Sequence, residues 1–216
     1  MFYNSGFTGA VCGGAFESLT GSSSAFSNLG SSTAHLQCGC PPGKFNSQAK
    51  EDAECQDCIV GKFSDGYGAD SCADCIAGKY QDQNDQSSCK PCSKGTYNNQ
   101  VGQNECTNCE KGKYNDQTDQ TSDTNCKSCQ LGRYQTQNAQ STCNGCSKGM
   151  YNDQVGQTEC TNCEKGKYND QVNQVSDANC KSCEQGKWSS DLGRTTDCAQ
   201  CDKGKYNDQV TQLQCK

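Results

Sequence analysis

Residues 106–117 read CTNCEKGKYNDQ, and residues 160–171 read CTNCEKGKYNDQ again, 54 positions later. The segment NCKSC at 125–129 recurs at 179–183 with the same offset. Within this long period lies a shorter one, Cys-x-x-Cys-x-x-Gly-x-aromatic, which recurs every 17 residues and occasionally every 18 or 20. Fixed periods of this length are typical of proteins built from stacked copies of one small unit. The sequence therefore predicts a repeat array.

Ten copies of the repeat can be aligned on the cysteine that opens each one: Cys40, Cys58, Cys75, Cys92, Cys109, Cys129, Cys146, Cys163, Cys183 and Cys201. Every copy has a glycine three residues later, at 43, 61, 78, 95, 112, 132, 149, 166, 186 and 204, and an aromatic residue two positions beyond the glycine. A glycine at one position in ten copies indicates a backbone requirement, either a positive φ or close approach of the neighbouring layer.

A polar segment with turn composition follows the aromatic residue in each copy. We therefore expect each repeat to be a minimal hairpin, with two extended pieces of about four residues around a turn. The repeats from Cys109 to Cys126 and from Cys163 to Cys180 are longer, and the extra residues are interpreted as part of the polar turn. The long turns at 114–124 and 168–178 are expected to project about 30 Å apart, at about 10 Å per layer, and to make lateral contacts.

The composition argues against an ordinary apolar core. Of 216 residues, 31% are hydrophobic, and this figure includes 22 cysteines. Such a cysteine density is typical of small secreted scaffolds that are stabilised by disulfides. The expected fold is small and disulfide-rich: an elongated solenoid of about ten short β-hairpin units with little hydrophobic core. The expected location is extracellular, either secreted or at the cell surface.

Charge and hydropathy patterns exclude two classes of partner. The formal charge is −6, and the 19 Lys and Arg residues are dispersed, so no basic patch for nucleic acid is predicted. No run of 18 apolar residues is present, so no membrane insertion is predicted within this sequence. Residues 1–10 lack the basic start and apolar stretch of a secretory signal, and the sequence is interpreted as a mature product or a segment of a longer chain.

The chain divides into two regions by composition. Residues 1–37 are rich in Ser and Gly and contain five aromatic residues, and residues 38–216 hold the tandem repeats. Two interpretations of residues 1–37 remain open. The segment is either a flexible linker or an assembly arm whose aromatic side chains dock on a neighbouring chain.

The disulfide connectivity has two alternatives. Bonds within Cys-x-x-Cys are strained and typical of redox enzymes, so nine in a row are not expected. The simplest pattern joins the cysteine that opens each repeat to the first cysteine of the next pair, and an interleaved pattern is its rival. The simplest pattern uses all 22 cysteines. Its pairs are Cys12 with Cys38, Cys40 with Cys55, Cys58 with Cys72, Cys75 with Cys89, Cys92 with Cys106, Cys109 with Cys126, Cys129 with Cys143, Cys146 with Cys160, Cys163 with Cys180, Cys183 with Cys198, and Cys201 with Cys215.

The unit Cys-x-x-Gly-x-Tyr, a polar loop and Cys-x-x-Cys resembles the ephrin-receptor-like cysteine-rich repeat and the first half-module of tumour-necrosis-factor-receptor cysteine-rich domains. Residues 40–45, CPPGKF, are the closest match, and the resemblance extends from Cys40 to Cys215. It implies elongated extracellular rods in which the first cysteine of each half-module bonds the second, which favours the simplest pairing. The chain lacks the crossed-disulfide second half of the receptor modules.

Metal and catalytic sites find little support in the sequence. Zinc would suit paired Cys-x-x-Cys motifs, but nine pairs do not divide into four-cysteine sites. Calcium is the more tenable metal, because the Asn115-Asp116 pair recurs at 152–153, 169–170 and 207–208, although the same residues are ordinary turn formers. The one histidine, His35, has no recognisable nucleophile beside it, so no enzyme and no cofactor are predicted.

The monotony of the repeats favours a structural role. The predicted function is a disulfide-stapled rod within an extracellular filament, surface appendage or matrix, with copies of itself or other filament proteins as partners. The Ser and Thr residues leave room for O-linked glycans, whereas Asn-x-Ser/Thr sequons are absent. The alternative is the stalk or ligand-binding ectodomain of a cell-surface receptor.

Overall fold

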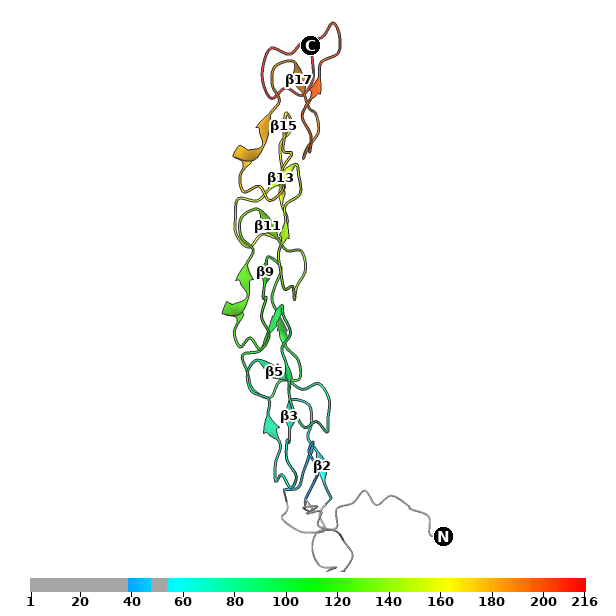
Figure 1. Ribbon diagram of the computed structural model, residues 1–216, viewed down its shortest axis with the longest axis vertical. Helices are drawn as coiled ribbons and strands as arrows, with labels where there is room; N and C mark the ends of the chain where they lie inside the picture. The colour runs from blue at the N-terminus through cyan, green and yellow to red at the C-terminus, as the bar shows by residue number, and fades with distance from the viewer. Residues whose placement is uncertain (1–38, 48–53) are drawn as a thin grey trace, which may run out of the picture. The chain divides into compact units, whose positions relative to one another are not determined.

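The computed structural model of the chain describes residues 39–47 and 54–216 (Figure 1). The segment 1–37, His35 and the expected Cys12–Cys38 bond lie outside these residues. The described residues fall into two compact units. One contains those up to Pro91 together with Gln100–Cys106, and the other contains Cys92–Asn99 and Thr107–Lys216.

Nine antiparallel hairpins of two strands each make up the regular structure of the described residues. The first strand of each hairpin is the aromatic residue and the one before it: β1 (Lys44–Phe45), β3 (Lys62–Phe63), β5 (Lys79–Tyr80), β7 (Thr96–Tyr97), β9 (Lys113–Tyr114), β11 (Arg133–Tyr134), β13 (Met150–Tyr151), β15 (Lys167–Tyr168) and β17 (Lys187–Trp188). The second strand is the pair of residues inside the following Cys-x-x-Cys: β2 (Gln56–Asp57), β4 (Ala73–Asp74), β6 (Lys90–Pro91), β8 (Thr107–Asn108), β10 (Lys127–Ser128), β12 (Asn144–Gly145), β14 (Thr161–Asn162), β16 (Lys181–Ser182) and β18 (Ala199–Gln200).

The strands are shorter than the expected four residues because the backbone beyond them bonds elsewhere. In the seventh repeat, β13 pairs with β14 only through Met150 and Tyr151. The next residue, Asn152, donates its N–H to the carbonyl oxygen of Gln174 in the following repeat, at 2.9 Å. The tenth repeat contains no assigned strand, but Tyr206 and Lys216 exchange backbone hydrogen bonds of 3.0 and 3.2 Å.

Consecutive repeats are joined by backbone hydrogen bonds. Between the seventh and eighth repeats, Gly149 N donates to the carbonyl oxygen of Asn169 and Asn173 N donates to that of Cys146, both at 2.8 Å. These two bonds and the bond from Asn152 to Gln174 form a three-bond pattern. The same pattern joins the second and third repeats, where Gly61 donates to Gln81 at 2.7 Å. Figure 1 shows β9, β11, β13, β15 and β17 in chain order along the C-terminal unit, and β2, β3 and β5 in chain order along the other unit.

Disulfides take the place of an aliphatic core. Within the described residues, every fully buried apolar residue is a cysteine. The cysteines that open the first nine repeats are between 0% and 3% exposed. The aromatic residues of these repeats are half-buried against the layers, whereas Tyr206 in the tenth is 60% exposed. The architecture is therefore the expected disulfide-rich array of short hairpins with little hydrophobic core.

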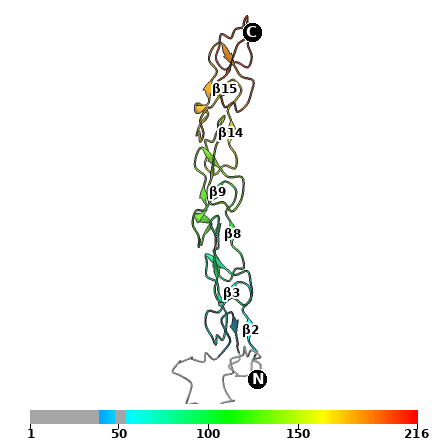
Figure 2. The same ribbon diagram turned by 45° about the vertical axis from the view of Figure 1, so that its right-hand side comes forward.

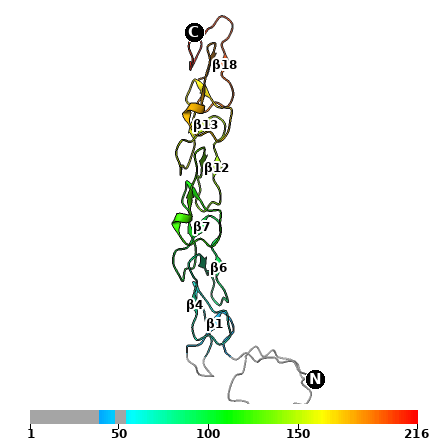
Figure 3. The same cartoon turned by 60° about the vertical axis from the view of Figure 1, so that its left-hand side comes forward.

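The three extra residues of each long repeat form a 3-10 turn, which differs from the expected extension of the polar turn. These elements are η2 (Asp123–Asn125) and η3 (Asp177–Asn179), and each lies directly before the closing cysteine of its repeat. The polar turn itself keeps its form, with a positive φ at Asp119 and Asn173, the fifth residue after the aromatic, as at Gly102 and Gly156 in short repeats. Figures 1, 2 and 3 show η2 (green) and η3 (orange) on the same side of the C-terminal unit.

Candidate functional site

The disulfide bond that closes each repeat is the first candidate feature. The structure joins Cys40 with Cys55, Cys58 with Cys72, Cys75 with Cys89, Cys109 with Cys126, Cys129 with Cys143, Cys146 with Cys160, Cys163 with Cys180, Cys183 with Cys198, and Cys201 with Cys215. Cys92 and Cys106 are also disulfide-bonded. Each bond closes a loop of 14 to 17 residues, for which the chain-entropy model assigns about 3 kcal/mol. No described cysteine is a free thiol that could bind zinc or act as a nucleophile.

The glycine of the repeat has a positive φ in every copy, and in several copies it also lies against the backbone of a later repeat. All ten glycines of the repeat have a positive φ, between 73° and 89°. Gly149 shows the second requirement, because a Cβ atom placed there would lie 2.0 Å from the carbonyl oxygen of Gly193, two repeats further along the chain. Glycine at this position therefore leaves room for the polar turn of the repeat two positions later in the chain. Substitution at this position meets both a strained φ and a backbone contact.

A column of buried polar side chains follows the aromatic residues. The members from the second repeat on are at most 6% exposed: Ser64, Gln81, Asn98, Asn115, Gln135, Asn152, Asn169, Ser189 and Asn207. Asn152 uses its Nδ2 group to donate to the carbonyl oxygen of Arg133 in the preceding repeat, at 2.6 Å. Its Oδ1 atom accepts from the backbone N–H of Gln154, at 3.2 Å. Asparagine at this position thus connects two layers and also holds its own turn.

Glutamine at the same position bonds only within its own repeat. Gln135 donates from Nε2 to the carbonyl oxygen of Thr142 at 2.8 Å and accepts from the N–H of Gln137 at 3.1 Å. These buried positions are not predicted from the sequence, in which the Asn-Asp pairs are interpreted as turn residues or calcium ligands. The signal was present in the sequence, since Asn, Gln or Ser follows the aromatic residue in all ten copies.

The calcium interpretation does not fit these contacts. Both polar atoms of the Asn115 side chain bond backbone groups, at 3.0 and 3.1 Å. Asp116 instead pairs with Lys127 at 2.8 Å, and Asp170 pairs with Lys181 at 2.9 Å. Within residues 39–47 and 54–216, no three His, Cys, Asp or Glu side chains gather in a way that could hold a metal ion. The Asn115 amide and the Asp116 and Asp170 carboxylates are thus engaged within the protein.

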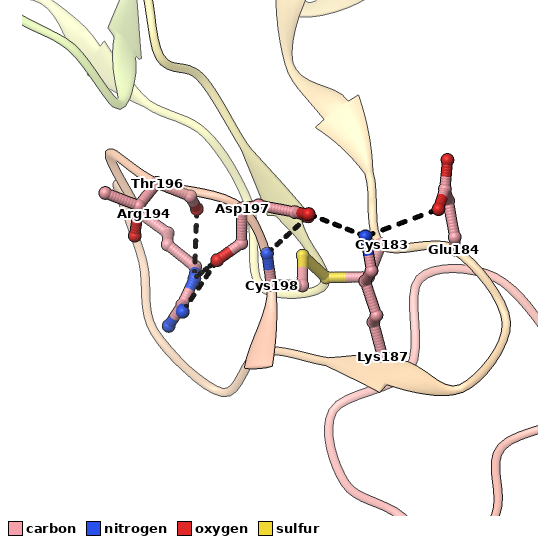
Figure 4. A network of polar contacts seen from close by, with 7 residues as sticks. All are labelled: Cys183, Glu184, Lys187, Arg194, Thr196, Asp197 and Cys198. Atoms are coloured by element: carbon pink, nitrogen blue, oxygen red, sulfur yellow. Dashed lines mark hydrogen bonds and ion pairs between the residues drawn. A yellow bond between two sulfur atoms is a disulfide. The ribbon is translucent and has the colours of Figure 1, made fainter. Parts of the chain in front are cut away.

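Lysine–aspartate pairs hold the hairpins on their outer surface. In the ninth repeat, Lys187 lies between Asp197 at 2.6 Å and Glu184 at 3.3 Å (Figure 4). Arg194 donates from Nε to the carbonyl oxygens of Thr196 and Asp197, at 3.1 and 2.9 Å. The Cys183–Cys198 disulfide lies beside this network, so charged contacts and a covalent bond close the same repeat.

Hydrogen bonds from lysine lower the pKa of several aspartates. Lys127 and Lys181 hold the pKa values of Asp116 and Asp170 below the ordinary carboxyl value, and the pKa values of both lysines are raised in return. The same two lysines lie 5.8 and 5.5 Å from the ring centroids of Tyr114 and Tyr168. The two long repeats therefore carry the same aspartate–lysine–tyrosine cluster.

A shallow polar hollow of about 160 Å³ lies beneath η2. Its lining residues are Tyr97, Thr107, Asn108, Cys109, Glu110, Lys113, Asp123 and Cys126. At the equivalent place in the other long repeat, Lys167 contacts Asp177 at 2.7 Å and Glu164 at 3.8 Å. Burial, followed by the negative charge of Asp177, raises the pKa of Tyr151 beside this cluster. The residues at these two places form surface ion-pair clusters, and they include no nucleophile paired with a general base.

The repeats match a known protein family. A family described as tyrosine-protein kinase ephrin type A/B receptor-like matches residues 61–102, 78–126 and 132–180, which together are more than half of the chain. The chain belongs to this family. No curated protein matches the chain. The resemblance predicted from the repeated cysteine motif is thereby confirmed.

The ephrin-receptor-like repeats are of an extracellular, receptor-like type that is not catalytic. A disulfide in every described repeat fits an extracellular location. In the part of the chain that the structure describes, no helix has the length and apolar character needed to cross a membrane.

Proposed function

We propose that the chain is a structural component of an extracellular filament, surface appendage or matrix, and that it acts as a disulfide-stapled rod rather than as an enzyme. The observation that carries this proposal is the repeated interlayer bonding, in which each layer is tied to the next by the same backbone hydrogen bonds. Such quasi-one-dimensional stacking suits a protein that bears load or sets a spacing.

The uniformity of the repeats supports a structural role over ligand binding. The hollow beneath η2 is lined mainly by polar and charged residues, unlike the largely apolar pockets that small ligands occupy. The exposed hydrophobic residues of the turns include Val101, Val155 and Leu192, each four positions after the aromatic residue of its repeat. Surfaces of this kind favour contacts repeated along an assembly, where weak interactions add through multivalency.

We assign the chain to the cell surface or the secreted space, with copies of itself or other filament proteins as partners. Exposed Thr and Ser side chains on the turns are available to O-linked glycans, for example at Thr118 and Thr121. The alternative function, the stalk or ligand-binding ectodomain of a cell-surface receptor, is favoured by the family match itself.

Imaging of the purified chain tests the proposal. The disulfide-intact protein is concentrated stepwise and examined by sedimentation velocity and negative-stain electron microscopy. The structural role predicts ordered polymers or bundles above a threshold concentration. A monodisperse monomer at every concentration contradicts it, and a membrane-spanning segment in the mature polypeptide would favour the receptor alternative.

A further inference from the structure

The two long repeats are nearly identical, and their few differences lie together. Residues 106–126 and 160–180 agree at 17 of 21 positions. The four differences all fall in the segment that runs from the polar turn into the 3-10 turn, where Thr, Asp, Thr and Thr are replaced by Val, Asn, Val and Ala. The positions are 118, 119, 121 and 124 in the first copy and 172, 173, 175 and 178 in the second. Every replacement removes a hydroxyl group or a charge.

The replacements lie on the exterior of the protein. Val172 is 52% exposed and Val175 is 43% exposed, and Ala178 is also exposed. Their counterparts Thr118 and Thr121 are exposed as well. At Val172 the change places apolar methyl groups in water, whereas one methyl group of Val175 lies close to Gly132 of the sixth repeat.

The backbone of the two segments is the same, so the difference is one of surface chemistry. Asp119 and Asn173 have φ values of 58° and 59°. Ser122 and Ser176 both cap their 3-10 turns, each accepting a 3.2 Å hydrogen bond from the backbone N–H two residues later. Both turns lie on one side of the C-terminal unit (Figures 1, 2 and 3). We name residues 172–178 the apolar turn and residues 118–124 the polar turn twin.

We propose that the apolar turn is a self-association surface that packs against the apolar turn of a second copy of this chain. This inference rests on the structural role proposed above and names the contact that serves it. In an isologous contact the same surface of two chains meets. Like charges on that surface would then lie opposite each other and oppose the contact. The apolar turn carries neutral Asn173, whereas the polar turn twin would bring two Asp119 carboxylates together.

The polar turn twin also disfavours a shift of 54 residues between neighbouring chains. If both turns were apolar, neighbouring chains could slip by 54 residues and pair one copy of the turn with the other. The hydroxyl groups and the carboxylate of the polar turn twin penalise that arrangement, because the Asp119 charge would lose its water against valine and keep only the hydrogen bond from Thr118. A single contact of this size is weak, so it acts by repetition in an assembly.

An exchange of the two turns tests the proposal without endangering the fold. Variant A carries V172T, N173D, V175T and A178T, which copies into the apolar turn a sequence that the same chain already folds at 118–124. Variant B is the matched control and carries T118V, D119N, T121V and T124A. Sedimentation equilibrium of the intact chain and both variants measures self-association up to about 1 mM, and the same samples are imaged by electron microscopy.

The proposal predicts that variant A associates at least roughly tenfold more weakly than the parent chain and that variant B forms larger assemblies. A parent chain that stays monomeric, or a variant A whose association constant is unchanged, overturns it. Filaments that persist unchanged in variant A remove this contact but leave the proposed structural role intact. Dimers that are lost in variant A, in a parent chain that forms no filaments, support the contact and count against the structural role.

Discussion

The side-chain Nδ2 group of Asn152 donates a 2.6 Å hydrogen bond to the backbone carbonyl oxygen of Arg133, 19 residues earlier in the preceding repeat. Asn115, Asn169 and Asn207 make the same bond to Thr96, Met150 and Lys187, at distances between 2.8 and 3.2 Å. A buried asparagine side chain therefore connects adjacent layers at these four positions.

Replacing Asn152 with leucine should loosen the contact between the sixth and seventh repeats. The change leaves the part-buried Arg133 carbonyl and Gln154 N–H without their partners. The penalty for a fully buried group, about 1–3 kcal/mol, is therefore an upper bound for each. Amide hydrogen exchange should show faster exchange in these two repeats, while the disulfides remain intact. Asn99→Leu, at an exposed position, is the control and should leave exchange unchanged. Equal effects from both variants would contradict the account.

Three glycine substitutions separate the cost of a strained φ from the cost of a backbone contact. Gly66→Ala has open space and no positive φ, so its effect should stay within about 0.5 kcal/mol. Gly186→Ala has a φ of +77° but open space, and should cost about 1–2 kcal/mol. Gly149→Ala should be worse than either, because its Cβ would lie 2.0 Å from the Gly193 oxygen. Thermal unfolding of the three variants gives the ranking, and a Gly149 variant as stable as the Gly186 variant would refute it.

The lysine–aspartate pairs should make the surface of the long repeats sensitive to acid. Because Lys181 lowers the pKa of Asp170 in the folded protein, the pair stabilises above the unfolded carboxyl value of about 3.9 and is lost as pH falls through the lower folded value. The raised pKa of Lys181 means that the alkaline loss begins only above the ordinary lysine value. NMR titration of Asp170 should show its midpoint rise in Lys181→Gln, and an unchanged midpoint would disprove the pairing.

Shortening both long turns should preserve the repeats and remove the lateral contact. Deleting residues 122–124 and 176–178 converts a disulfide separation of 17 into the separation of 14 found in short repeats, such as that between Cys146 and Cys160. Far-ultraviolet circular dichroism and a free-thiol assay should report an intact fold. Light scattering should report lost bundling, and bundles that survive the deletion would contradict the prediction.

The sequence predicts the repeat boundaries and the glycine column because cysteine and glycine have strict geometric requirements. It predicts hairpins at the right places, but it overestimates their strands, since residues such as Asn152 turn their backbone groups to the next layer. Such interlayer bonds join residues about 20 positions apart and leave no local pattern. The buried role of Asn152 was missed for the same reason, because asparagine beside aspartate is also ordinary turn composition.

The sequence also locates the two insertions, but it does not predict their conformation. Ser122 and Ser176 are helix-capping residues, and each precedes an aspartate, yet the segment is too short to show helical periodicity. The chemical contrast between Val172 and Thr118 is visible in the sequence alone. Its meaning depends on the structure, which shows that the differing side chains are exposed on turns with the same backbone.

The central claim, that these repeats build an extracellular assembly, is tested most directly by locating the chain in its native material. Antibodies against residues 172–179 and 118–125 would be used for immunogold electron microscopy of intact surfaces and of extracted filaments. The account predicts gold labels at regular intervals along elongated extracellular structures, with the apolar turn masked until the assembly is dispersed. Uniform labelling of the cell membrane, with both segments equally accessible and no elongated structure labelled, would contradict it and favour a receptor ectodomain.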